Sequence, residues 1–305
     1  MASAANLRNK TPIIVAGPTG VGKTAFAVEL ANRLDGEILG ADAYQVYRGM
    51  EILTAQPDHE SRSAVPHHLI GFLSPAEPFD AAHFVTLARE KISKILARGK
   101  LPIITGGSGL YIKALTHGLV DRPPGSSSLR SELAELSTHQ LRERLGKLDP
   151  DAKVDIHNPR RVVRALEISI LTGRPASELH RDWQTKATPG FRGLLLVRER
   201  AELSARIAEN VRGMFERGVV AEVGRIPELG PTAAMAIGLR EIQALRRGEL
   251  SQSECVDAVT LSTRRYVKRQ LTWFRNQFMF EIIDLTGLRD THEIPPRALE
   301  FLGAA

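Results

Sequence analysis

The chain has 305 residues, of which 43% are hydrophobic and 25% charged, and its formal net charge is +6. This composition excludes collagen-like, wholly disordered and membrane-spanning proteins, and the single cysteine, Cys255, excludes a disulfide framework. The first residues lack the apolar stretch of a secretory signal, so we expect a soluble, cytoplasmic protein with no membrane partner.

The N-terminal third alternates between strand and helix patterns. The segment TPIIVA (11–16) predicts a buried strand, and a glycine-rich turn leads from it into a helix over 24–34. A second strand is predicted at 37–42, an amphipathic helix at 83–99 and a third strand at 100–107. This alternation is typical of a parallel α/β sheet.

The pattern changes at DRPPGSSS (121–128), whose proline, glycine and serine residues predict a hinge. The stretch 129–182 is mostly helical and rich in charge. FRGLLLVR (191–198) predicts a strand that returns to the sheet, and 202–280 is again mainly helical. The hinge and the change of pattern together indicate a second domain inserted into the first.

GPTGVGKT (17–24) matches the pattern G-x-x-x-x-G-K-[ST] in full, between a predicted strand and a predicted helix. In such a loop, glycines let successive N–H groups point at an anion beside a helix N-terminus. Lys23 adds a positive charge, and the Thr24 hydroxyl can hold Mg²⁺. The predicted polyphosphate site consists of Gly17, Pro18, Thr19, Gly20, Val21, Gly22, Lys23 and Thr24. The loop does not identify the ligand, because a diphosphate on any carrier offers the same groups.

The loop and the alternating pattern predict an α/β fold with a P-loop NTPase-like parallel sheet. We expect the core to comprise 1–120 and 190–305, with a helical C-terminal region, and a mostly helical insertion domain to occupy 121–189.

Asp42 closes the second predicted strand, and ligands of open α/β sheets bind beyond the carboxyl ends of the strands. Three roles compete for this carboxylate. It could hold Mg²⁺, accept a proton from an incoming nucleophile, or cap the next turn. The position of the residue alone does not decide among them.

Basic residues cluster at NPRRVVR (158–164) and at STRRYVKRQLTWFR (262–275), where aromatic residues are interleaved. Clustered arginines with aromatics suit a phosphate backbone and unstacked bases. The simpler interpretation of either cluster is a solvated helix face.

Seven segments together resemble the tRNA dimethylallyltransferase (tRNA isopentenyltransferase, IPP transferase) family, in the same order and at similar spacing. The resemblance runs from about residue 12 to about residue 280. D-x-x-Q-V-Y-R-G-M, followed later by K-R-Q-L-T-W-F-R, is its most specific part. The segments are GPTGVGKT (17–24), GADAYQVYRGMEILTAQP (40–57), VPHHLI (65–70), LPIITGGSGLYIKAL (101–115), NPRRVVRALEISILTGRP (158–175), AIGLREI (236–242) and TRRYVKRQLTWFRNQ (263–277).

The resemblance implies a prenyl transferase that uses Mg²⁺. It would move a dimethylallyl group from dimethylallyl diphosphate to N6 of the adenosine 3′ of the anticodon, tRNA position 37. The residue matching the family's general base is Asp42, and the resemblance gives Lys23 and Ser108 as further catalytic residues. Arg206 matches an arginine directed at the diphosphate. Ser108 stands where the family usually has threonine. The family is usually monomeric.

The resemblance also implies a tRNA surface, to which both basic clusters contribute. On a helix, Arg160 and Arg164 would share one face, which suits two neighbouring phosphates. Val267, Leu271 and Phe274 would instead face the core. The tRNA-binding residues so implied are Asp42, Ala43, Tyr44, Gln45, Ser108, Arg130, Arg160, Arg161, Arg164, Arg240, Lys268, Arg269, Gln270 and Arg275.

Three other functions share parts of this pattern. A small-molecule or nucleotide kinase has the same loop and α/β core, but it needs neither arginine cluster. An isopentenyltransferase acting on free adenine nucleotides would lack the tRNA-binding helices. A non-catalytic RNA-binding protein with a vestigial loop is disfavoured by the intact Lys23, Thr24 and Asp42.

Overall fold

The structure is a computed structural model that describes residues 11–119, 126–179, 185–288 and 293–303. It divides into two compact units. The core unit comprises Met1–Thr116 and Ala187–Ala305, and the insertion unit comprises His117–Lys186, against the 121–189 expected from the sequence. Most of the expected hinge, 121–125, lies outside the described residues.

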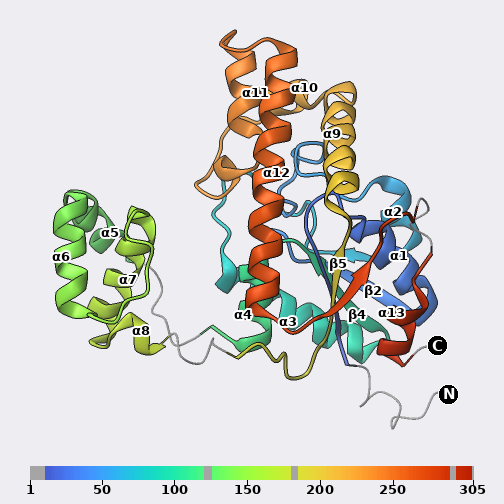
Figure 1. The fold of residues 1–305 in the computed structure, drawn as a ribbon, viewed down its shortest axis with the longest axis horizontal. Coiled ribbons are helices and arrows are strands. Elements are labelled where there is room, and N and C mark those ends of the chain that lie inside the picture. Colours follow the sequence, from blue (N-terminus) through green and yellow to red (C-terminus); the bar gives the residue numbers. More distant parts are fainter. Residues whose placement is uncertain (1–10, 120–125, 180–184, 289–292, 304–305) are drawn as a thin grey trace. The chain divides into compact units, whose positions relative to one another are not determined.

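The core unit is built on a six-stranded sheet whose strand pairs are all parallel, in the order β3-β2-β4-β1-β5-β6 (Figure 1). The strands are β1 (Ile13–Ala16), β2 (Gly36–Gly40), β3 (His67–His68), β4 (Leu101–Gly106), β5 (Arg192–Val197) and β6 (Glu281–Asp284). The four strands predicted from the sequence are confirmed, while the short β3 and β6 at the two edges were not predicted. The α/β parallel-sheet fold class is therefore confirmed.

The central strands are buried along their length, because helices cover both faces of a parallel sheet. Ile14, Ile38 and Ile103 have no exposed surface. The helices of the core unit are α1 (Lys23–Leu34), α2 (His59–Ala64), α3 (Ala81–Ala97), α4 (Gly109–His117), α9 (Arg200–Glu216), α10 (Val219–Gly224), the 3₁₀ helix η3 (Ala233–Met235), α11 (Leu239–Arg246), α12 (Gln252–Gln277) and α13 (Pro296–Leu302). Within the described residues, no helix is both long and apolar enough to cross a membrane.

Helix α12 is the longest, with 26 residues, and it packs beside α9 and α11 (Figure 1). It begins with a capping box formed by Ser251 and Glu254. Its buried face includes Val267, Gln270 and Phe274, so the core positions predicted for Val267 and Phe274 are confirmed, while Leu271 is only half-buried. The opposite face carries basic side chains, and α12 therefore joins the core to a positive surface.

The insertion unit consists of α5 (Ser127–Ala134), α6 (Thr138–Leu148), α7 (Pro159–Thr172) and α8 (Ala176–Leu179), which confirms its predicted helical character. Asn158 caps α7 by accepting a hydrogen bond from the Arg161 backbone N–H, and Pro159 occupies the first turn. The unit has its own apolar core, formed by Leu133, Leu141, Leu145, Val162, Ala165, Leu166, Ile168, Ala176 and Leu179.

Candidate active site

The phosphate-binding motif forms the turn between β1 and α1, as the sequence predicts. Gly20 and Gly22 have φ angles of 83° and 107°, which side chains rarely adopt, and this accounts for the glycines at both positions. A Cβ at Gly17 would approach the Leu196 carbonyl oxygen to 3.0 Å. The loop thus passes close over β5 before α1 begins at Lys23.

The Lys23 ammonium donates a hydrogen bond of 2.8 Å to the Pro18 carbonyl, across the mouth of the loop. Burial lowers the pKa of Lys23 to about 8, and the nearby negative charge of Asp42 opposes this shift. An anion seated in the loop would relieve the cost of burying this charge. A phosphate-type anion in the loop would therefore stabilise the protonated form of Lys23.

Two arginines contact the loop from outside. Arg206 Nε donates to the Gly20 carbonyl at 3.1 Å, so the structure brings the predicted diphosphate arginine to the loop. Arg198 Nε donates to the Val21 carbonyl at 2.9 Å and also binds the carbonyls of Leu285 and Leu288. Sequence reasoning left Arg198 without a role because the motif around it is weak. Its place as a buried support of the loop depends on contacts with the C-terminal segment.

Asp42 follows β2 at the carboxyl edge of the sheet, which is the edge that holds the phosphate loop. Its Oδ1 accepts a hydrogen bond of 3.0 Å from the Tyr44 backbone N–H, so the capping role considered for it is present. Burial raises the pKa of Asp42, while backbone N–H groups and the charge of Lys23 oppose the shift. A half-buried carboxylate whose pKa is raised and which lies within electrostatic range of the Lys23 ammonium is suited to proton transfer.

Ser108 joins the two loops that carry the site. Its Oγ accepts a hydrogen bond of 2.9 Å from the Ala43 N–H, and its own N–H donates to the Ala41 carbonyl at 3.2 Å. The residues on both sides of Asp42 are therefore fixed to the turn after β4. Either serine or threonine provides the hydroxyl that this contact needs.

Tyr266, on α12, is a site residue that sequence reasoning missed. Its phenol lies near Ser108 and within electrostatic range of Asp42 and Tyr44, and burial raises its pKa. The Arg269 guanidinium lies 5.5 Å from the centre of the Tyr266 ring. The only sequence signal was its position four residues before Gln270, on the same side of the helix.

Two glutamines predicted to bind tRNA are bonded inside the protein. The Gln270 side chain is 4% exposed, and it bonds to Thr19 and Gly107. Its side chain therefore offers little surface to a ligand, and its predicted contact with tRNA stays a prediction. Gln45 Nε2 donates to the carbonyls of Thr54 and Ala55, which leaves its oxygen as the part available to a ligand.

The remaining predicted tRNA residues of the core unit lie as expected of a surface. Arg240 on α11, and Lys268, Arg269 and Arg275 on α12, are all exposed. Ala43 and Tyr44 are half-buried beside Asp42. The structure thus places a run of cations on the outer face of the helix whose inner face contacts the site.

In the insertion unit, Arg130 and Arg164 share a buried partner, Glu167, which sequence reasoning did not anticipate. Arg130 Nε lies 3.0 Å from Glu167 Oε1, Arg164 pairs with Oε2, and the Ser126 N–H donates to Oε1 at 2.7 Å. Burial alone would raise the pKa of Glu167, but these hydrogen bonds lower it below its usual range. Arg160 and Arg161 are exposed at the start of α7.

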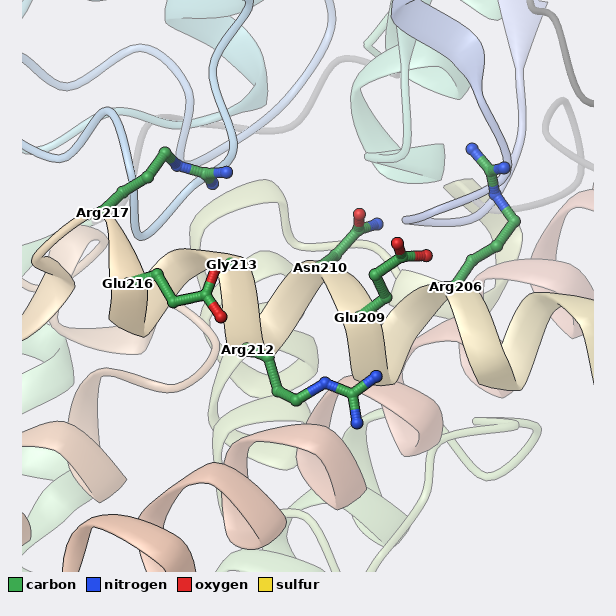
Figure 2. Close-up of a pocket in the computed structure, with 7 residues that line it drawn as sticks. All are labelled: Arg206, Glu209, Asn210, Arg212, Gly213, Glu216 and Arg217. Atoms are coloured by element: carbon green, nitrogen blue, oxygen red, sulfur yellow. The ribbon is translucent and has the colours of Figure 1, made fainter.

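A polar pocket of 560 Å³ opens along α9 beside the phosphate loop (Figure 2). Arg206, Asn210 and Arg217 extend from one side of the helix, and Arg212 extends from the other. A Cβ at Gly20 would lie 3.7 Å from the Asn210 amide, so this pocket adjoins the loop. Its residues are Arg206, Glu209, Asn210, Arg212, Gly213, Glu216 and Arg217.

The site suits a metal held mainly by its substrate. In the described part of the chain, no three His, Cys, Asp or Glu side chains gather as a metal site. The Thr24 hydroxyl, at the start of α1, is half-buried and makes no side-chain hydrogen bond within the described residues. Mg²⁺ needs few protein ligands when phosphate oxygens and water complete its shell, so these residues fit that ion.

The parallel sheet, the complete phosphate-loop motif and the half-buried carboxylate of Asp42 beside it define an α/β protein with a P-loop-like fold. A family model described as IPP transferase matches residues 45–277. This chain belongs to the IPP transferase family.

Individual relatives are similar over nearly the whole chain. A protein of Akkermansia muciniphila named tRNA dimethylallyltransferase is 40% identical over 293 residues, covering 95% of this chain and 99% of its own. The crystal structure of a tRNA isopentenylpyrophosphate transferase from Bacillus halodurans is 34% identical, with a TM-score of 0.68, over 97% of this chain and 94% of its own. A eukaryotic dimethylallyltransferase, described as acting on tRNA, is 27% identical with a TM-score of 0.82, over 95% of this chain and 78% of its own.

Proposed function

We propose that this protein is a tRNA dimethylallyltransferase. It transfers the dimethylallyl group of dimethylallyl diphosphate to N6 of the adenosine 3′ of the anticodon, tRNA position 37, and releases diphosphate. The observation that carries the proposal is the placement of Asp42 within electrostatic range of Lys23, at the sheet edge that holds the loop. This reaction needs a general base close to a site that binds diphosphate. The named relatives support the same reaction.

In the proposed reaction, Asp42 acts as the general base. The bond between the dimethylallyl carbon and the diphosphate oxygen breaks, and a bond from that carbon to N6 forms. Asp42 accepts the proton that N6 loses. An exocyclic adenine amine is a poor nucleophile, and a positioned base contributes roughly 10²–10⁴-fold to such a step. The pKa of Asp42, raised by burial, strengthens it as a proton acceptor.

The phosphate loop stabilises the leaving diphosphate. Backbone N–H groups at the start of α1, the Lys23 ammonium and the Arg206 guanidinium face the developing negative charge. The Thr24 hydroxyl would hold Mg²⁺, which would supply further neutralisation of the diphosphate charge. Ser108 holds the backbone beside Asp42 and so fixes the base relative to the adenine.

We infer that tRNA contacts both units through the exposed cations. On the core unit these are Arg240, Lys268, Arg269 and Arg275, and on the insertion unit Arg160 and Arg161. Arg130 and Arg164 contribute through guanidinium groups that Glu167 orients. The protein would act as a monomer in the cytoplasm, where its tRNA substrate is found.

Transfer of label from dimethylallyl diphosphate to unmodified tRNA, in the presence of Mg²⁺, tests the proposal. A parallel reaction contains γ-labelled ATP, and a third replaces tRNA with free adenine nucleotides. Label in tRNA from the prenyl donor alone is the expected result. Label transferred from ATP would make the chain a kinase, and label on free nucleotides alone would make it a nucleotide isopentenyltransferase.

A further inference from the structure

Gln270 connects two loops that are far apart in the sequence. Its Oε1 accepts a hydrogen bond of 3.0 Å from the Thr19 N–H of the phosphate loop. Its Nε2 donates one of 3.0 Å to the Gly107 carbonyl, in the turn after β4. The side chain is 4% exposed, so both bonds form away from water, where an unmade bond is costly.

The turn after β4 lies directly against α12. A Cβ at Gly107 would come within 2.2 Å of Gln270 Nε2, and one at Gly109 within 2.1 Å of Trp273. Glycine at these two positions therefore lets the turn approach Gln270 and Trp273. This close packing fixes the position of the turn after β4 against α12, and the Gln270 side chain makes the hydrogen bond that joins the turn to the helix.

The same turn holds the base. The Gly107 N–H stabilises the Asp42 carboxylate, and Ser108 Oγ accepts from the Ala43 N–H. Gln270 thus bonds on one side to the loop that would hold the leaving group, and on the other to the turn that positions Asp42.

We propose that Gln270 is a positioning residue that fixes the phosphate loop relative to Asp42. This inference rests on the proposed prenyl transfer. A glutamine amide provides one acceptor and one donor at a fixed separation, which is what the Thr19 N–H and the Gly107 carbonyl require. Because Lys268 and Arg269 are exposed on the same helix, α12 also connects the tRNA surface to the diphosphate site.

Gln270→Glu tests the hydrogen bond that Gln270 Nε2 donates to the Gly107 carbonyl. An ionised carboxylate accepts from Thr19 but cannot donate to the Gly107 carbonyl, and its charge opposes a diphosphate. A protonated carboxyl makes both bonds. Burial raises the pKa of a carboxyl group, so lowering the pH from 8.5 to 6 should restore the variant. We expect its affinity for inorganic diphosphate to be about tenfold below wild type at the higher pH, and close to wild type at the lower.

The readout is the ratio of variant to wild type at each pH, for diphosphate affinity by calorimetry and for kcat and KM in prenyl transfer. The titratable groups on the adjoining elements are Lys23, Asp42, Tyr266 and Arg269. They are present in both proteins, so the ratio reports on position 270. Gln252→Glu, at the exposed start of α12, is the matched control and should show no pH-dependent ratio.

Gln270→Met keeps the length of the side chain and removes both hydrogen bonds. We expect its diphosphate affinity and its kcat to fall about tenfold at every pH, with no recovery in acid. This variant decides the question if the glutamate variant does not fold, which circular dichroism checks. Wild-type values for both variants would overturn the positioning role. Absence of prenyl transfer by the wild-type protein would instead overturn the proposed function, while the diphosphate titrations would still test Gln270.

Discussion

At the scale of single residues, the surroundings of Asp42 shift its pKa in opposite directions. Burial raises its pKa, while the N–H groups of Tyr44, Gln45 and Gly107 and the charge of Lys23 favour the ionised form. The net effect is a pKa above that of a solvated aspartate, so the ionised side chain is a stronger proton acceptor. A group in this state is useful as a base and costly as a purely structural residue.

Asp42→Asn should lower the rate of prenyl transfer by roughly 10²–10⁴-fold, because the amide cannot accept the N6 proton. tRNA affinity should change little, since the side chain keeps its size and its oxygen still accepts from Tyr44. Single-turnover rates and filter binding measure the two quantities. Asp257→Asn, on the exposed face of α12, is the control and should be unaffected. An unchanged rate for Asp42→Asn would remove this residue as the base.

Lys23 makes diphosphate binding dependent on pH. Its pKa of about 8 in the free protein is far below the ordinary value, so it loses its charge as the pH rises through 8. Diphosphate binds the protonated form, and affinity should therefore fall above pH 8, by up to about tenfold per pH unit. Titration calorimetry between pH 7 and 9.5 measures this. Lys23→Met should bind diphosphate more weakly at every pH, and its affinity should fall less as the pH rises. An equal pH dependence of affinity in both proteins would exclude Lys23 as the source of that dependence.

The sequence predicts where Lys23 and Asp42 lie in the fold, but it does not predict the contacts of Gln270 and Tyr266, for a physical reason. The phosphate loop is a local structure whose motif, glycines and flanking elements are adjacent in the chain. Gln270 and Tyr266 acquire their roles only when α12 packs on the turn after β4, some 160 residues earlier in the chain. No local pattern reports such a contact, which is why Gln270 was assigned to tRNA with its exposed neighbours.

At the scale of elements, short strands are also poorly predicted from the sequence, because contacts distant in the chain define them. β3 has two residues and β6 has four, of which only Ile283 is buried, so neither shows the apolar pattern of a central strand. Both are strands because a neighbour already in the sheet offers free backbone groups. The long amphipathic helices α9 and α12 were predicted because their periodicity extends over several turns.

Helix α7 separates two kinds of arginine, which gives a prediction about stability and RNA binding. Arg164→Ala removes one partner of the buried Glu167 and should destabilise the insertion unit by about 2 kcal/mol. Arg161→Ala removes an exposed cation, and should change stability by less than about 0.5 kcal/mol while reducing the salt slope of tRNA binding by about one. Thermal melting and tRNA titrations between 50 and 200 mM salt measure both. The opposite assignment of effects would show that Arg164 contributes more to phosphate binding than Arg161 does.

At the scale of the whole molecule, the two units have separate cores and separate ligand surfaces. The phosphate loop, Asp42 and the turn after β4 all belong to the core unit, whereas Glu167 and its arginines belong to the insertion unit. The apolar cluster of the insertion unit is complete within 117–186. Cooperative unfolding follows the boundaries of such cores, so each unit should respond to its own ligand.

Calorimetric melting with and without inorganic diphosphate tests this division. A ligand at 100 times its Kd stabilises the unit that binds it by about 2.7 kcal/mol, or roughly 5–10 °C for a unit of this size. We expect diphosphate to raise the transition of the core unit by that amount and to leave the transition of the insertion unit unchanged. Unmodified tRNA should raise both, because its proposed contacts are on both units. An equal shift of both transitions by diphosphate alone would mean that the units unfold as one, and that the insertion unit responds to the donor as well as to tRNA.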